Sequence, residues 1–583
     1  MHLKQAHNKK TGRTYLSIVQ SYWDKERGSS RAKTIEKIGY LDELQKVHAD
    51  PISHFKNLVA EKNAQSIQAS TGNIIKFSKD QILEKSTSNR KNYGYIVIVK
   101  LLTELGLERF LINKKQSTKL ECSTSSIMKL LVISRILSPG SKKRAFLEKE
   151  KYFDFEGDKN FDLNSIYRSL SHFSTLSKDI QLLIHSRIIK HYGRKTALVY
   201  YDITNYYFEI DKEDELRKKG YSKENRKSPI VQLGLSMDEE GIPISYELFP
   251  GNESEKLHLR PMISELVRKY EAGKIIVVAD SAQNTGNNIW YLDNAKQNYV
   301  FSQSIAGGST EFKNYVTSEV GYDWFEEKYK RKSRVCRREI TVDFIRGTDT
   351  IKRKVLVDQR QIVFYSEKYA KRAKEKREAV IKKAHNIINN PGAYTSATSY
   401  GALKYVKNVE VDKKTGALKE SKGTPLFDFE KLQEEEQYDG YYAIVTNVFN
   451  EGEDPTKFDD DAIIGMYRGL WKIEDCFRIS KSDLETRPVY LSREDRIEAH
   501  FLLCFIALVV MRLIQKRVHN RFSAERLVEA MNKISCSLEE ENWFLFDHRC
   551  DVTDALGEVF ELDFTKKRMT RSDIKKALGT AKK

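Results

Sequence analysis

Three acidic side chains of this 583-residue chain lie where a metal-dependent phosphoryl transfer would need carboxylates. Asp202 ends the strand-like segment ALVYYD, Asp280 ends the strand-like segment KIIVVAD, and Glu474 lies in the helical segment YRGLWKIEDCFRISK. Two divalent ions about 3.5–4 Å apart need acids on rigid elements to hold an attacking and a leaving oxygen in line. A single aspartate at a strand end is usually a loop cap, so the hypothesis depends on all three acids together.

A helix over the last of these segments would place four polar side chains on one face, since about 3.6 residues make one turn. These side chains are Tyr467, Glu474, Arg478 and Lys481. Leu470, Ile473 and Phe477 form a separate apolar stripe, so the helix can bury one side and present the polar groups on the other. For this helix alone, ordinary surface ion pairs at helical spacing explain the same residues.

The segments around the acids indicate an α/β domain. The strand-like segments ALVYYD with TNYYFEI, SPIVQLGLSMD and IPISYELF precede the helical SEKLHLRPMISELVRKY, and KIIVVAD follows. The apolar segment GYYAIVTNV at 440–448 is the expected fifth strand. This succession matches an RNase H-like fold, in which acids from the first strand, the fourth strand and a late helix meet. A doubly wound nucleotide-binding fold is the competing interpretation, but no GxGxxG, GxxxxGKS or GxxxxGKT follows these strands.

The stretch between Asp280 and Glu474 is far longer than such a core needs, which implies an inserted domain. We expect a basic and mainly β insertion that lies beside the site. Basic and apolar residues alternate from Lys328 to Lys354, which is typical of strands, and a charged helix is expected from Ser366 to Ile388.

The rest of the chain divides by composition and pattern. A basic β-hairpin is expected over 13–41, and helices, which either bind DNA or serve in packing or dimerisation, from about Asn92 to Ile189. The predicted regions are 1–90 (hairpin and linker), 91–192 (helical domain, expected to bind DNA), 193–297 (first part of the core), 298–438 (insertion), 439–515 (second part of the core) and 516–583 (helical, with a basic tail).

The composition excludes membrane and disulfide-rich classes. With 40% hydrophobic and 31% charged residues, the chain should be soluble and globular, with several domains. The apolar run Phe501 to Met511 is shorter than the roughly twenty residues of a membrane span, so we expect a buried helix there. Six scattered cysteines without zinc spacing and a polar start, MHLKQAHNKKTGR, indicate a cytoplasmic protein.

The charge balance favours a polyanionic partner. The net charge is +18 and the pI about 9.2, and Lys and Arg that bind phosphates release condensed counterions. Charge alone fits a ribosome-associated protein equally well. The basic tail, Thr565 to Lys583, is either a DNA-facing surface or a loose solvated end.

Longer motifs then narrow the class. They are YYDITNYYFE (200–209), KGYSKENRKSPIVQLGL (219–235), GIPISYELFPGNESEK (241–256), VVADSAQNTGNNIWYL (277–292), FSQSIAGGSTEF (301–312) and LWKIEDCFRISKSDLETRPVYLSREDRIEAHFLLCFIALVV (470–510). In this order they resemble bacterial insertion-sequence transposases of the DDE superfamily. The resemblance is to the branch whose RNase H-like core is interrupted by a β-rich insertion domain. The hairpin region with GYLDEL at 39–44 also resembles this group.

The resemblance implies roles for single residues. Asp202, Asp280 and Glu474 would hold two Mg²⁺ ions, with Mn²⁺ as a substitute, and Tyr467 and Lys481 would contact phosphates of the DNA end. The branch has an arginine where this chain has Leu470, and Arg478 is the substitute candidate. In relatives that cleave through a DNA hairpin an aromatic stacks on a flipped base, for which Trp290 and Trp324 are candidates.

The implied activity is cleavage at the terminal inverted repeats of an element, which frees a 3′-OH that then attacks target DNA. The expected partners are double-stranded DNA and a second copy of the chain on it, at the nucleoid in the cytoplasm. A nuclease of the same fold without strand transfer and a catalytically inactive DNA-binding relative are the alternatives. A tyrosine recombinase would need a tyrosine among arginines and histidines near the C-terminus, and no such group is found there.

Overall fold

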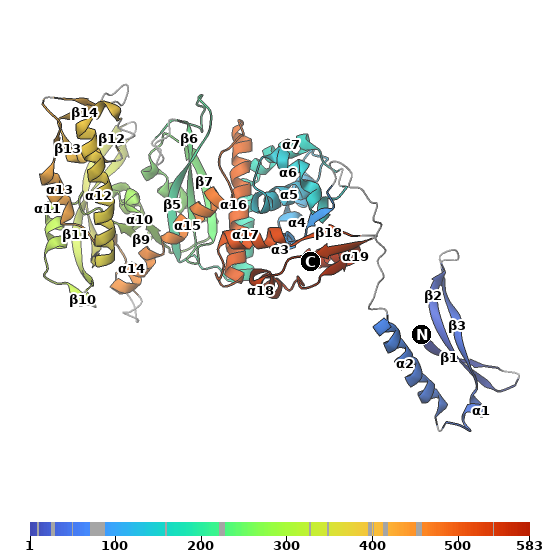
Figure 1. The fold of residues 1–583 in the computed structure, drawn as a ribbon. Coiled ribbons are helices and arrows are strands. Elements are labelled where there is room, and N and C mark those ends of the chain that lie inside the picture. Colours follow the sequence, from blue (N-terminus) through green and yellow to red (C-terminus); the bar gives the residue numbers. More distant parts are fainter. Residues whose placement is uncertain are drawn as a thin grey trace. The chain divides into compact units, whose positions relative to one another are not determined.

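The computed structural model describes residues 1–8, 11–24, 29–48, 50–69, 88–157, 160–220, 228–325, 328–346, 349–394, 399, 401–411, 418–421, 423–449, 458–539 and 542–583. The chain divides into two compact units, Met1–Thr87 and Ser88–Lys583. Each unit has a β-sheet of its own (Figure 1).

The first unit is built on a three-stranded antiparallel sheet in the order β1-β2-β3. Its elements are β1 (His2–His7), β2 (Thr14–Asp24), β3 (Ser29–Tyr40), α1 (Leu41–Leu44) and α2 (Pro51–Ala69). Leu16, Ile18 and Val19 of the central strand are buried. The predicted hairpin is confirmed as β2 and β3. Strand β1 was not predicted, because HLKQAH has no alternation of apolar and polar residues and is mostly exposed.

A nine-stranded sheet organises the second unit, in the order β10-β11-β12-β17-β9-β8-β5-β6-β7. The strands are β5 (Leu198–Tyr207), β6 (Ile230–Met237), β7 (Pro243–Pro250), β8 (Ile276–Ala279), β9 (Asn298–Ser302), β10 (Asp323–Phe325), β11 (Tyr329–Arg346), β12 (Asp349–Ser366) and β17 (Tyr441–Thr446). Strands β5, β8 and β9 are parallel, and the other neighbouring pairs are antiparallel. The predicted succession of strands and helix between Asp202 and Asp280 is confirmed.

The fifth strand of this succession differs from the prediction. Strand β9 pairs in parallel with β8, whereas β17, at the predicted position, pairs antiparallel with β9 as the next strand outward. The prediction that 440–448 supplies the fifth strand is therefore wrong. The segment NYVFS is too short to be recognised by periodicity, and it becomes a strand because β8 offers it a parallel partner.

The side chains of the central strands alternate between two apolar cores, as successive residues of a strand point to opposite faces. Odd-numbered residues such as Tyr201 and Ala279 pack with α9 (Leu259–Lys269) and α10 (Gly286–Asn294). Even-numbered residues such as Tyr200 and Val278 belong to the core that contains α14 (Asp460–Arg468), α15 (Trp471–Arg478) and α16 (Glu494–Arg517). The same alternation directs Asp202 and Asp280 to the face of α14 and α15.

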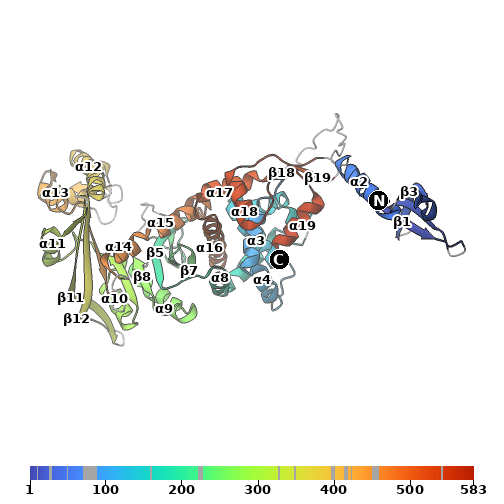
Figure 2. The same cartoon turned by 90° about the horizontal axis from the view of Figure 1, so that it is seen from below.

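The segment between β9 and β17 contains helices as well as strands. It includes α11 (Thr310–Thr317), β10 to β12, α12 (Glu367–Asn389), α13 (Phe429–Glu436) and the short strands β13 (Val406–Lys407), β14 (Val409–Val411), β15 (Leu418–Glu420) and β16 (Leu426–Phe427). The predicted basic strands and charged helix are confirmed. The strands extend the main sheet, since β12 pairs with β17, and the long β11–β12 hairpin reaches α10 (Figure 2).

Helices occupy the first part of the second unit, where periodicity predicts them. They are α3 (Ile96–Glu104), α4 (Leu107–Lys115), α5 (Thr124–Leu137), α6 (Lys142–Leu147), α7 (Leu163–Thr175) and α8 (Ser177–Tyr192). Residues 138–141 separate α5 from α6: Ser138 is the C-cap of α5, and the side chain of Ser141 accepts from the Arg144 amide to cap α6. We call α3 to α8 the helical module.

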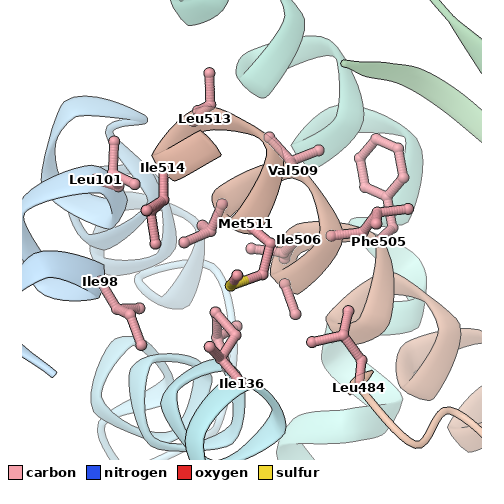
Figure 3. Close-up of a cluster of buried hydrophobic side chains, with 14 of the residues drawn as sticks. Ile98, Leu101, Ile136, Leu484, Phe505, Ile506, Val509, Met511, Leu513 and Ile514 are labelled. Atoms are coloured by element: carbon pink, nitrogen blue, oxygen red, sulfur yellow. The ribbon is translucent and has the colours of Figure 1, made fainter. Parts of the chain in front are cut away.

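The long helix α16 lies at the centre of the main core, between the helical module and β7 (Figure 1). Its Ile506, Val509 and Met511 form one cluster with Ile98 of α3 and Ile136 of α5 (Figure 3). Among the described residues it is the one helix long and apolar enough to span a membrane, but 94% of that window is buried inside the protein. The prediction of a buried helix at this position is confirmed.

The C-terminal region contains strands that the sequence pattern does not predict. Its elements are α17 (Ala524–Lys533), β18 (Ser535–Leu538), β19 (Trp543–Phe546), α18 (Asp551–Phe560), β20 (Arg568–Thr570) and α19 (Arg571–Ala581). Strand β4 (Arg90–Asn92) joins them in a sheet of order β20-β19-β18-β4. The basic tail is ordered, because α19 buries Ile574 and Leu578 in the main core.

Candidate active site

Asp280 directly follows β8, whereas Asp202 lies within β5, which continues to Tyr207, so Asp202 does not end a strand as predicted. Tyr200 of β5 pairs with Val278 of β8 in parallel, which is the last pair of this register. Extending the register by two residues on each chain places Asp202 opposite Asp280. Both side chains are half-buried. Asp202 Oδ1 accepts from the Ile203 amide at 2.7 Å and Asp280 Oδ1 from the Ala282 amide at 3.0 Å. The backbone therefore fixes both carboxyl groups.

Glu474 belongs to a helix that runs along the same face of β5. A Cβ at Gly469, just before α15, would lie 1.8 Å from the Tyr200 hydroxyl, so the backbone of this junction rests on Tyr200. At the other end, the Tyr206 hydroxyl and Ser480 Oγ are 2.9 Å apart. Asp202 lies between Tyr200 and Tyr206 on the strand, and Glu474 lies between Gly469 and Ser480 on the helical segment. Both acids thus belong to the contact between β5 and α15.

Tyr467 of α14 connects the end of β9 with two of the acids. Its side chain is hydrogen-bonded to Ser302, and Ser302 also accepts from Asn284 Nδ2 at 3.0 Å through its carbonyl oxygen. Burial is the main cause that raises the pKa of Tyr467, and the carboxylates of Asp280 and Glu474 raise it further. Tyr467 is therefore a neutral phenol between the second and third acids.

The predicted single helix from Tyr467 to Lys481 is broken into three pieces. Helix α14 ends at Arg468, α15 covers Trp471–Arg478, and a π-helical turn covers Ile479–Asp483. The spacing argument that put four polar side chains on one face requires an unbroken helix, so it does not hold here. The apolar side is as predicted, since Ile473 and Phe477 are buried.

Arg478 and Lys481 point to different partners. The Arg478 guanidinium pairs with Asp475 Oδ1 at 3.0 Å and with Asp483 Oδ2 at 3.2 Å, and thereby bridges α15 and the π-helical turn. Lys481 Nζ lies 5.6 Å from the centre of the Tyr206 ring, on the strand of Asp202. Arg478 therefore braces the segment that carries Glu474, and its contact with DNA stays a prediction.

The structure does not bring Trp290 or Trp324 to the acids. Trp290 lines a cavity with Leu198 and Asn298, the first residues of β5 and β9, and so lies at the opposite edge of the sheet. Trp324 is on the outermost strand, β10, where Lys330 Nζ lies 4.8 Å from its ring centre.

The tryptophan nearest to the acids is one that the sequence argument passed over. Trp471 is 58% exposed and precedes Glu474 by about one helical turn, so the two share a side of α15. The signal available in the sequence was this spacing, within the segment WKIE.

A polar cavity of about 550 Å³ opens beside Ser281, the residue after Asp280. Its other walls include Asn284, residues of the loop 303–309, Arg334, Arg337 and Arg338 of β11, and the acids Glu311 and Glu339. Arg334 pairs with Glu311 at 3.0 Å and Arg337 with Asp358 at 3.1 Å. Arg338 donates to Asn284 Oδ1 at 3.3 Å and to Gln359 Oε1 at 3.4 Å, and it forms no ion pair among the described residues. Burial lowers the pKa of Arg338, which is the cost of holding this cation away from water. The cavity, which we call the β11 cavity, suits an anion such as a backbone phosphate.

The metal-binding capacity of the site depends on how close Glu474 comes to the aspartates. Among the described residues, no group of three or more His, Cys, Asp or Glu side chains is close enough together to hold an ion. Asp202 and Asp280 are neighbours by register, whereas Glu474 is exposed on its helix. As a donor set, three carboxylates on three rigid elements fit Mg²⁺, which takes hard oxygen ligands.

Comparisons with known proteins point to one class. Residues 186–510 match the sequence profile of the transposase DDE domain, and residues 3–71 match that of the N-terminal domain of IS1634 family transposases. No curated protein matches the chain.

Two kinds of transposase complex are similar to the structure at low identity. A piggyBac transposase synaptic complex with hairpin DNA has a TM-score of 0.35 and 8% identity, with 84% of each chain covered. A Mos1 transposase paired-end complex with left transposon end has a TM-score of 0.14 and 10% identity, with 41% of this chain and 66% of that chain covered.

Proposed function

The chain belongs to the DDE transposase family, and from this premise we propose that Asp202, Asp280 and Glu474 are the acids with which it cuts and joins DNA. It is a transposase of an insertion sequence, an enzyme that cleaves DNA and transfers the cut strand to a target. The proposal assigns that chemistry to the carboxyl edge of the central sheet.

One observation carries the assignment. The parallel register of β5 and β8 sets Asp202 opposite Asp280 on the face that α15 covers. Two acids on adjacent strands and a third on the covering helix are the arrangement that a two-ion phosphoryl transfer uses. The sheet order β7-β6-β5-β8-β9, with the last three strands parallel, supports an RNase H-like core. The insertion would then follow β9 and not begin at residue 298, and β17 would belong to it, with the core resuming at α14.

Transposases of this family depend on divalent cations. Asp202, Asp280 and Glu474 would hold two Mg²⁺ ions, for which Mn²⁺ can substitute. When bound, the ions polarise the scissile phosphate and lower the pKa of an attacking water. The chain's own part is to hold the carboxylates: the Ile203 and Ala282 amides orient the two aspartates, and the docking of α15 positions Glu474.

DNA would be held by groups that surround these acids. Arg338 of the β11 cavity would take a backbone phosphate beside Asp280, and Lys481 and Tyr467 would contact phosphates nearer Glu474. Trp471 replaces Trp290 and Trp324 as the aromatic on which an unstacked base can lie, because it is exposed and next to Glu474.

The test is cleavage and joining of a labelled duplex that carries the DNA flanking the coding sequence in its element. Wild type should release a 3′-OH end with Mg²⁺, not with EDTA, and join that end to a second duplex. Glu474→Gln should abolish both reactions while Glu558→Gln, a charge-neutralising change on α18, leaves them intact. Cleavage without joining would identify a nuclease, and DNA binding with neither reaction would identify an inactive relative.

The active form would be a homodimer on DNA, in the nucleoid of the cytoplasm, since two ends of an element must be brought together. Light scattering after gel filtration, with and without the end duplex, measures the mass of the complex. A mass of one chain in both conditions would overturn the dimer.

A further inference from the structure

A second buried basic group lies away from the acids, where the helical module meets the segment after the π-helical turn. A cavity of about 180 Å³ is lined there by Arg135, Lys142, Tyr167, His500 and residues of the segment 485–491. Arg135, Lys142 and His500 are only 6%, 7% and 4% exposed. These polar groups are therefore built into the fold and do not belong to a solvated surface. We call this space the Lys142 cavity.

The hydrogen bonds of His500 fix its tautomer. Nε2 lies 3.0 Å from the Thr486 carbonyl oxygen, which can only accept, so Nε2 carries the proton. Nδ1 of the neutral ring is then an acceptor, and Lys142 Nζ donates to it at 2.8 Å. Of the three ammonium donors of Lys142, this is the one bond that the described residues satisfy.

Arg135 and Lys142 are two buried cations without a carboxylate partner among the described residues. Arg135 uses its donors on backbone carbonyls of Leu484, Glu485 and Gly140. Burial first, and the charge of Arg135 second, lower the pKa of Lys142 to about 7. Unpaired buried charges are costly, so an anion in this cavity would stabilise the arrangement.

We propose that the Lys142 cavity binds a phosphate oxyanion, and that its source is the backbone of DNA held on the catalytic face. The volume suits a tetrahedral oxyanion with some water, and Lys142 has donors left for it. Arg487 on the wall adds a third cation, while Glu485 is exposed and interacts with Arg144. Tyr490, 75% exposed at the rim, offers a surface for a sugar or base.

A chain of hydrogen bonds joins this cavity to the catalytic strand. His500 is bonded to the Thr486 carbonyl, the Thr486 hydroxyl lies 3.0 Å from Ser480 Oγ, and Ser480 contacts the Tyr206 hydroxyl at 2.9 Å. Tyr206 is on β5, the strand of Asp202. A phosphate at Lys142 would thus fix the segment that follows Glu474 against the helical module. The DNA source of the phosphate rests on the proposed function, whereas the oxyanion site does not.

Thermal unfolding of the full-length protein in inorganic phosphate and in chloride of equal ionic strength tests the site directly. Phosphate should raise the unfolding midpoint of wild type and of Lys143→Met, an exposed neighbour on α6, but not that of Lys142→Met. Lys142→Gln, which can still donate to His500, is the second variant in case Lys142→Met folds poorly. Phosphate should not raise the unfolding midpoint of Lys142→Gln either. A phosphate shift that survives in both Lys142 variants would overturn the site.

The salt dependence of duplex binding tests the DNA source. The slope of log K against log salt is negative, and its magnitude should be smaller by about one unit for Lys142→Met than for Lys143→Met, because one phosphate contact is lost. Equal slopes with an intact phosphate shift in wild type would mean a free-anion site and overturn the DNA assignment. Glu474→Gln should leave both readouts unchanged, so failure of the catalytic assignment is measured separately.

Discussion

The two aspartates and the glutamate of the active site are held by different kinds of structure. Asp202 and Asp280 belong to the neighbouring parallel strands β5 and β8. Both are half-buried, and each carboxylate accepts a hydrogen bond from a backbone amide. Glu474 is exposed on a short helix between a glycine junction and a π-helical turn. A sheet register cannot slip by one residue without turning every side chain to the other face, whereas a docked helix can shift in small steps. The aspartates are the fixed half of the site, and Glu474 is the half that depends on docking.

Substitution of the acids should have the largest effect and separate the two halves. Asp280→Asn and Glu474→Gln should each lower cleavage by about a thousandfold or more, since each removes a charged ion ligand. In the absence of DNA, Mn²⁺ should raise the unfolding midpoint of wild type and of Glu474→Gln, but not of Asp280→Asn. Equal loss of the Mn²⁺ effect in both variants would show that all three acids are preassembled.

The docking of α15 can be broken without touching an acid. Gly469→Ala puts a methyl group on the Tyr200 hydroxyl and should displace α15, so we expect cleavage to fall by about a hundredfold. Gly465→Ala, on α14, is the matched control because nothing lies within 4 Å of its added Cβ. Cleavage rates of the two variants at saturating Mg²⁺ decide the matter, and equal rates would contradict the dependence on docking.

Removal of the exposed aromatic beside Glu474 should have a smaller effect. Trp471→Ala should lower cleavage by about tenfold, as stacking of a base on an aromatic ring contributes about 1–3 kcal/mol. Trp324→Ala, on the outer strand, should leave the rate within about twofold of wild type. A larger loss for Trp324 than for Trp471 would restore the original choice of tryptophan.

The smallest effect is expected at the far end of the docked segment. Tyr206→Phe removes the hydroxyl contact with Ser480 and should reduce the free energy of unfolding by about 1 kcal/mol. Ser480 keeps its contact with Thr486, so the π-helical turn should persist. Denaturant unfolding measures this loss, and a loss of cleavage as large as for Gly469→Ala would show that this contact, rather than the glycine junction, positions Glu474.

Hydrophobic periodicity and apolar runs predicted the longer strands and helices of the fold. The strands near the two aspartates, the charged helix α12 and the buried helix α16 follow from apolar runs. The predicted strand end at Asp202 is wrong, since β5 continues to Tyr207 by pairing with β6. Strand β9 could not be found in this way, because five residues of NYVFS carry too little pattern and the parallel partner β8 decides their conformation.

The candidate site was predictable to the same extent. The order of elements put the two aspartates at one edge, since parallel strands end together. The orientation of the third acid was not predictable, because the break at Gly469 follows from contact with Tyr200, a residue remote in sequence. The cations of the β11 cavity were expected as basic strands, but which of them lacks an acidic partner depends on burial that only the fold defines.

The small sheet that joins β4 to β18 has a consequence for the synthesis of the protein. Strand β4 is translated early in the second unit, but its partner β18 leaves the ribosome only near the end of synthesis. The apolar residues of α3 likewise become covered only after α19 has been synthesised. A product that stops short of these elements keeps apolar surface uncovered, which favours aggregation or degradation. Truncated copies of the gene should therefore yield few stable protein fragments. Such fragments would then compete little with the intact protein for binding to DNA ends.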